Sequence, residues 1–146
     1  MKEQDIRWQQ RFDNFSKALL LLRTPLEEKA VAEFDDLQKE GLIQRFEYTF
    51  ELLWKTLKDY LQYQSVNIEI ISPKKVFRAA ASSNLLEAMD VDGEILLDML
   101  EKRNMMSHTY DIDKFTNTLL QLQEVYLPEM IKVFLYLDSK RYIENE

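Results

Sequence analysis

Apolar residues recur along this chain at alternating spacings of three and four, with hardly any glycine or proline to interrupt them. That spacing places side chains on one face of an α-helix. The 146 residues contain only 2 glycines and 3 prolines, whereas all-β folds need both residues in their many turns. The chain has the length of one domain and can bury a core without disulfides. We therefore predict a single all-α domain over residues 1–146.

Capping residues and prolines divide this pattern into separate helices. Thr24 before Pro25 and Ser72 before Pro73 each combine an N-cap residue with proline at the first helical position, and Asp92 offers a further cap. We expect helices over residues 4–23, 25–40, 42–64, 73–82 and 93–104, an irregular connector over Val66–Ile71, and a final long helix capped by Asp111 or Asp113.

Glycine and proline should also mark where two of these helices end or bend. Gly41 is expected to end the second helix, because glycine readily adopts the conformation that closes helices. Pro128 lacks an N–H and should kink or restart the last helix near Leu127. Long helices with short connections favour an up-and-down antiparallel bundle of four or five main helices. The expected inner residues are Trp8, Phe12, Phe15, Leu19, Leu22, Val31, Phe34, Leu37, Ile43, Phe46, Phe50, Leu53, Trp54, Leu57, Leu61, Ile95, Leu96, Met99, Leu100, Phe115, Leu119, Leu122 and Tyr126.

Composition argues against several classes of function. There is no cysteine, which excludes disulfides and thiolate metal sites. A single histidine argues against a histidine-based zinc site within one subunit, so we predict no metal and no cofactor. A polar N-terminus and the lack of a membrane-length apolar run predict a cytoplasmic protein without a membrane span. The formal net charge of −7 argues against broad nonspecific nucleic-acid binding, though a local basic site remains possible.

The residues best suited to chemistry gather in the octapeptide of residues 103–110, at the end of the helix predicted over 93–104. Arg103 can hold a phosphate bidentately and stabilise charge that develops on it. His108 can take a proton from an RNA 2′-hydroxyl, or give one to a leaving oxygen, near neutral pH. Asn104 can orient either group. These three residues are therefore a candidate catalytic set for metal-free RNA cleavage.

Structural roles for the same residues stay open. A histidine at a helix end commonly caps carbonyls, and a neighbouring arginine commonly forms a surface ion pair. Tyr110 is either a half-buried packing residue with its hydroxyl at the surface, or its hydroxyl is a nucleophile or an acceptor of a covalent modification. The spacing of Arg103 and His108 alone is a weak motif.

Two charged clusters and one aromatic residue also have more than one interpretation. A basic cluster on the helix predicted over residues 73–82 can meet RNA phosphates or an acidic partner, or form a solvated helix face. An acidic pair, Glu47 and Glu51, can bind a metal or share a proton, or Glu51 can form an i,i+4 ion pair with Lys55. Tyr48 lies off the apolar stripe, which makes it a candidate for a second interface. The basic cluster is Lys74, Lys75 and Arg78, and the acidic pair is Glu47 and Glu51.

Residues 43–61, with the sequence IQRFEYTFELLWKTLKDYL, resemble the signature of the nucleotidyltransferase substrate-binding proteins, a family of small helical proteins of prokaryotes. Further matches lie at residues 72–76, at the helix start of residues 92–93, over the octapeptide and at residues 126–129. The resemblance covers nearly the whole chain. The long helical signature is specific, whereas the short motif alone is not.

The resemblance implies membership of the wider HEPN group, whose members are up-and-down helical bundles and often homodimers. The motif of that group is an arginine followed, after four to six residues, by a histidine. Arg103 and His108 satisfy it, and Asn104 occupies a position where asparagine is frequent. In ribonuclease members, the motifs of two subunits face each other in a composite site.

The resemblance also implies a partner. Members paired with a minimal nucleotidyltransferase encoded nearby act as toxins, and in a subset the partner transfers AMP to a tyrosine two residues after the histidine. Tyr110 occupies that position. AMP there would put an anion beside His108 and Arg103 and block RNA phosphates. The implied function is thus a metal-independent ribonuclease toxin silenced by AMP transfer to Tyr110.

Two alternatives accompany this expectation. The chain can be a non-catalytic subunit that binds the substrate or nucleotide for a two-component nucleotidyltransferase. It can also be a scaffold in which Arg103 and His108 hold a dimer interface.

Overall fold

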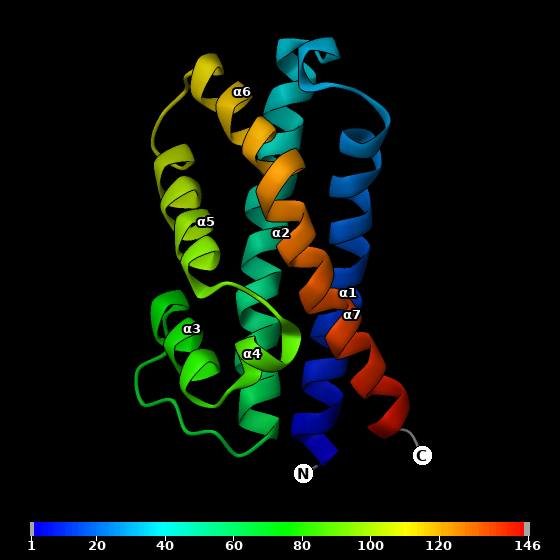
Figure 1. Ribbon diagram of the computed structural model, residues 1–146, viewed down its shortest axis with the longest axis vertical. Coiled ribbons are helices and arrows are strands. Elements are labelled where there is room, and N and C mark those ends of the chain that lie inside the picture. The colour runs from blue at the N-terminus through cyan, green and yellow to red at the C-terminus, as the bar shows by residue number, and fades with distance from the viewer. Residues whose placement is uncertain (1, 145–146) are drawn as a thin grey trace.

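Helices account for most of residues 2–144, the part of the chain that this computed structural model describes (Figure 1). Strands are absent from these residues, which confirms the predicted all-α class, and no helix among them is long and apolar enough to cross a membrane. The long helices run up and down side by side, with the start of α1 and the end of α7 at the same end of the bundle. The elements are α1 (Lys2–Glu28), η1 (Val31–Glu33), α2 (Asp36–Tyr63), α3 (Pro73–Ser82), α4 (Leu85–Met89), α5 (Gly93–Met106), α6 (Ile112–Gln121), η2 (Leu122–Tyr126) and α7 (Leu127–Glu144).

The first helix does not end where Thr24 and Pro25 predicted, because α1 continues through Pro25. A proline nitrogen cannot donate to the carbonyl four residues earlier, which here is that of Leu21. Arg45 on α2 supplies the missing bond, since its Nη1 donates to the Leu21 carbonyl at 2.7 Å. The Thr24 hydroxyl donates to a carbonyl within α1 rather than capping a new helix. The predicted boundary is wrong because a distant side chain satisfies the backbone group that proline leaves unpaired.

The helix predicted over residues 25–40 is replaced by the short turn η1 and by an early start of α2. Asp35 caps α2, because its carboxylate accepts the Gln38 N–H at 2.8 Å while the Gln38 side chain accepts the Asp35 N–H at 2.9 Å. α2 then continues through Gly41, so the predicted terminator is wrong. Leu37, expected in the core, is 78% exposed, because the new start of α2 turns it outward.

The middle of the chain follows the prediction more closely. Residues 66–71 form an irregular connector. Ser72 caps α3 and Asp92 caps α5, each accepting a backbone N–H with its side chain. The five-residue helix α4 is too short for periodicity to reveal, and it lies between Asn84 and Asp90, whose φ angles of 67° and 59° are left-handed.

The last third of the chain forms one long helical path with a change of register in it. Asp111, rather than Asp113, caps α6 by accepting two N–H groups of its first turn. The π-helical turn η2 follows, in which the Leu127 N–H bonds to the Leu122 carbonyl, one residue further back than in an α-helix. α7 begins at Leu127, which confirms the restart predicted from Pro128.

One continuous core lies between the helices. All the predicted inner residues are buried except Leu37, which is exposed, and Ile95 and Leu100, which are half-buried. Phe46 of α2 stacks on Tyr126 of η2 with ring centroids 6.1 Å apart. This core fixes α5 and its final turn against α2.

Candidate functional site

The octapeptide of residues 103–110 spans the last turn of α5 and the loop that leads into α6 (Figure 1). Helix α5 ends at Met106, two residues beyond the predicted end, so Arg103 and Asn104 are helical. His108 and Tyr110 lie in the loop. The structure therefore divides the candidate residues between a fixed helix end and the loop after it.

Arg103 is held against α2. Its Nη1 lies 3.5 Å from Glu51 Oε2, and its guanidinium lies 5.8 Å from the centroid of the Phe50 ring. The side chain is 24% exposed, and its Nε is buried without a hydrogen-bond partner among the described residues. Glu51 also pairs with Lys55 at 3.4 Å, as the i,i+4 spacing predicts. A phosphate that reaches Arg103 must therefore compete with a carboxylate shared by two cations.

Ser107, which the sequence analysis did not single out, joins the end of α5 to the second carboxylate of α2. Its hydroxyl lies 3.1 Å from Glu47 Oε2 and 2.9 Å from the Arg103 carbonyl, and its one proton serves one acceptor at a time. Its position at the C-terminal cap of α5 was the available signal. Glu47 therefore bonds to Ser107 and Glu51 pairs with Arg103, so two carboxylates of α2 lie beside the octapeptide.

His108 and Asn104 are both exposed. The backbone N–H of His108, rather than its imidazole, extends the last turn by bonding to the Met105 carbonyl at 3.4 Å. Within residues 5–141, no hydrogen bond or ion pair joins Arg103, Asn104 and His108 to one another. Arg103 packs against α2, whereas the side chains of Asn104 and His108 are open to solvent.

Tyr110 is anchored at its ring and exposed beyond it. It precedes the N-cap residue Asp111, and its ring meets Phe115 edge-on at 5.4 Å, which is the contact of a hydrophobic staple. The side chain is still 66% exposed. Desolvation, together with the negative charges of Glu40 and Asp36, raises the pKa of the Tyr110 hydroxyl. The phenol is therefore presented to solvent in its protonated form.

The other sequence candidates lie on the outside of the bundle. Lys74, Lys75 and Arg78 on α3 are all exposed, as a solvated face requires. Tyr48 is exposed as well, in line with its position off the apolar stripe. Because Tyr48 follows Glu47 on the same helix, the two side chains diverge by roughly 100° around α2.

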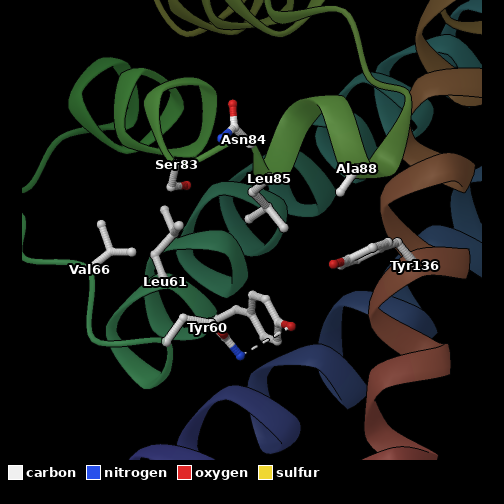
Figure 2. A pocket seen from close by; sticks show the side chains of 9 residues that line it. Tyr60, Leu61, Val66, Ser83, Asn84, Leu85, Ala88 and Tyr136 are labelled. Carbon is white, nitrogen blue, oxygen red and sulfur yellow. Dashed lines mark hydrogen bonds between the residues drawn. The ribbon is translucent and has the colours of Figure 1, made fainter.

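A pocket of about 300 Å³ opens at the C-terminal end of α2, away from the octapeptide (Figure 2). None of the residues that line it is charged. Tyr60 and Tyr136 come from different helices, and the Tyr136 hydroxyl points toward the hollow. Gln64 donates to the Tyr60 hydroxyl at 3.4 Å, and Ser83 lies on the opposite wall. Sequence analysis missed this pocket because its residues come from four separate segments.

Comparison with known families places this geometry in context. Residues 10–138 match the family model described as nucleotidyltransferase substrate binding protein like. The match runs from within α1 to within α7 and includes the octapeptide. A search of curated proteins finds no match. Because the family model covers most of the chain, the protein belongs to the nucleotidyltransferase substrate-binding protein-like family.

Proposed function

We propose that this chain is the helical partner subunit of a minimal nucleotidyltransferase, that Tyr110 accepts AMP from that partner, and that the unmodified chain is a metal-independent ribonuclease of the HEPN type. Family membership supports the nucleotidyltransferase partner. The observation that carries the proposal is the setting of Tyr110, which is 66% exposed on a fixed ring two residues after His108.

AMP transfer to Tyr110 is a displacement at phosphorus. The phenol oxygen attacks the α-phosphorus of ATP, the new bond forms from tyrosine oxygen to phosphorus, and pyrophosphate leaves with the electrons of the broken bond. The phenol proton must go to a base. Desolvation, together with the charges of Glu40 and Asp36, raises the pKa of this phenol, so its protonated form is favoured until a base arrives. The base, like the nucleotide, comes from the partner.

The ribonuclease chemistry uses the residues at the end of α5. His108 accepts the proton of an RNA 2′-hydroxyl, whose oxygen then attacks the adjacent phosphorus and expels the 5′-oxygen. Arg103 stabilises the negative charge that develops on the phosphate oxygens, and Asn104 orients the phosphate. The leaving oxygen needs a second proton donor. One chain holds one histidine, so a homodimer in which a second copy brings its own His108 completes the acid–base pair.

Modification of Tyr110 would silence this site by charge and bulk. The AMP group adds a phosphodiester anion and an adenosine next to the loop that carries His108. Its phosphate competes with RNA for Arg103, which already pairs with Glu51. Asp36 and Glu40, whose charges act on Tyr110, repel the same anion.

The test measures RNA cleavage by chain purified without its partner. We expect cleavage that is lost in His108→Ala with an unchanged circular dichroism spectrum, and lost again in wild-type chain whose Tyr110 carries AMP. Gln10→Ala, at an exposed position of α1 outside the candidate sites, is the control and should cleave normally. Undiminished cleavage by His108→Ala would refute the ribonuclease assignment.

A second candidate function rests on the uncharged pocket of Figure 2. In a non-catalytic substrate-binding subunit, this pocket would take a small neutral acceptor with a planar ring, since tyrosine faces and Ser83 line it while cations do not. Calorimetry with nucleosides tests this role. Saturable binding that Tyr136→Ala abolishes would support it, and no binding to the chain or to the reconstituted pair would rule it out.

A further inference from the structure

Exposed apolar side chains from two helices meet along the groove between α1 and α2. Leu21 of α1 and Tyr48 of α2 are each more than half exposed, and both line a hollow of about 190 Å³ together with Lys17 and Arg45. Arg45 also lines a second hollow of about 210 Å³ further along α2. We call Lys17, Leu21, Arg45 and Tyr48 the α1–α2 face. Exposed apolar side chains rimmed by polar groups are typical of surfaces that bind another molecule.

The charges on the α1–α2 face are positive, in a chain whose net charge is −7. Within the described residues, neither Lys17 nor Arg45 has a carboxylate within ion-pair distance. Arg45 donates to the Leu21 carbonyl, which fixes its guanidinium beside the groove. An occupant with apolar side chains between carboxylates complements this surface in both shape and charge.

A protein fits this face better than a nucleic acid does. Single-strand binding uses several aromatic rings along a basic groove, whereas this face offers the one ring of Tyr48, and two cations give little compensation for the overall negative charge. A surface-exposed tyrosine and an arginine around a small apolar hollow are instead the residue types that dominate the energetics of protein interfaces.

The α1–α2 face lies across α2 from the residue that the proposed function modifies. Desolvation raises the pKa of Tyr110, and the charges of Glu40 and Asp36 on α2 add to it, whereas Gln38 and Gly41 of α2 line the nearest hollow of the face. Asp36 and Glu40 lie on one side of α2, and Gln38 and Gly41 lie on the other side. Tyr110 and the hollow are therefore on opposite flanks of the same helix. Their separation is about one helix diameter, ~10 Å. The exposed Leu37 lies on the ridge between them.

We infer that the α1–α2 face is the docking surface for the nucleotidyltransferase partner, which places an apolar side chain between Leu21 and Tyr48 and carboxylates opposite Lys17 and Arg45. From that position the partner extends over Leu37 to reach Tyr110. This inference rests on the proposed function, because it takes its partner from there.

The test uses the full chain and the nucleotidyltransferase encoded beside it. The double variant Lys17→Glu/Leu21→Glu replaces the positive charge of Lys17 by a negative one and puts a second carboxylate in the groove. Arg45 is kept because it donates to the Leu21 carbonyl of α1. The matched control is Lys74→Glu/Leu135→Glu, which changes an exposed lysine and an exposed leucine elsewhere. Affinity is measured by biolayer interferometry, and modification by the mass of the chain.

We expect the double variant to bind the partner about tenfold or more weakly, and to carry correspondingly less AMP, while the control matches wild type. Tyr110→Phe should bind normally without being modified. Wild-type affinity in the double variant would overturn the docking surface. So would a loss confined to self-association or to RNA binding, each measured on the chain alone. A wild-type complex that forms but carries no AMP would instead leave the docking surface in place and refute Tyr110 as acceptor.

Discussion

Replacing Tyr126 by phenylalanine tests how η2 holds α5, the helix that ends in Arg103. Tyr126 is fully buried, and its hydroxyl donates to Asp98 of α5. Its ring stacks on Phe46 of α2. The substitution removes one oxygen and keeps the ring, so it isolates the hydrogen bond that ties η2 to α5.

The size of the effect follows from the partner. A hydrogen bond to a carboxylate contributes about 1.5–3 kcal/mol to folding stability. For a chain of this size, each kcal/mol lowers the melting temperature by roughly 2–4 °C. We therefore expect Tyr126→Phe to melt ~3–12 °C below wild type at neutral pH, as followed by far-ultraviolet circular dichroism.

The same bond predicts a dependence on pH. Burial, then the hydrogen bond and negative charge of Asp98, then the charge of Glu101, raise the pKa of Tyr126 above its ordinary value. The folded state therefore retains this proton longer than the unfolded state does. The stabilising contribution is complete below the ordinary tyrosine pKa of about 10 and is lost as the pH rises above it. The stability gap between wild type and Tyr126→Phe should narrow over that range.

The control for this experiment is Tyr48→Phe, which removes an exposed hydroxyl and should change stability by less than about 0.5 kcal/mol. If Tyr126→Phe melts with wild type, or if the stability gap stays constant above pH ~10, the hydrogen bond does not hold α5 as described.

Substitutions at three further positions probe other parts of the fold. Ser65 has a left-handed φ of 66° at the end of α2, so Ser65→Gly should stabilise the chain by about 0.5–1 kcal/mol in chemical denaturation, and a lower midpoint would contradict the strain. Glu129 is buried and accepts the Asp92 N–H at 2.9 Å while pairing with Lys132 at 2.8 Å. Glu129→Ala should cost about 1–3 kcal/mol in the same assay, and an unchanged midpoint would show that water replaces the carboxylate. Tyr110→Ala should lower the melting temperature because it removes the staple, whereas Tyr110→Phe keeps the ring and should melt with wild type; equal melting of both variants would argue against the staple.

Much of the fold could be predicted because its determinants are local. The spacing of apolar residues marks the inner faces of the helices, and Ser72 and Asp92 cap α3 and α5 where a side-chain acceptor meets the first free N–H groups. The helix boundary predicted from Pro25 was wrong because Arg45, 24 residues beyond Leu21, donates the hydrogen bond that the Leu21 carbonyl would otherwise lack. A local pattern contains no information on that contact.

The candidate site divides in the same way. Residues 103–110 stand out in the sequence because they carry the only histidine. The i,i+4 spacing of Glu51 and Lys55 predicts their ion pair, but it cannot predict that Arg103 shares Glu51. Ser107 and Glu47 meet across 60 residues of chain, and only the packing of α5 on α2 brings them together.

The most direct test of the proposed modification is the intact mass of this chain after co-production with the nucleotidyltransferase that we propose as its partner. We predict a mass higher than that of the chain alone by one AMP group, localised to Tyr110 by peptide fragmentation. The increase should be absent in Tyr110→Phe and retained in Tyr136→Phe. An unmodified mass in a chain that co-purifies with its partner, or an AMP group that persists in Tyr110→Phe, would contradict it.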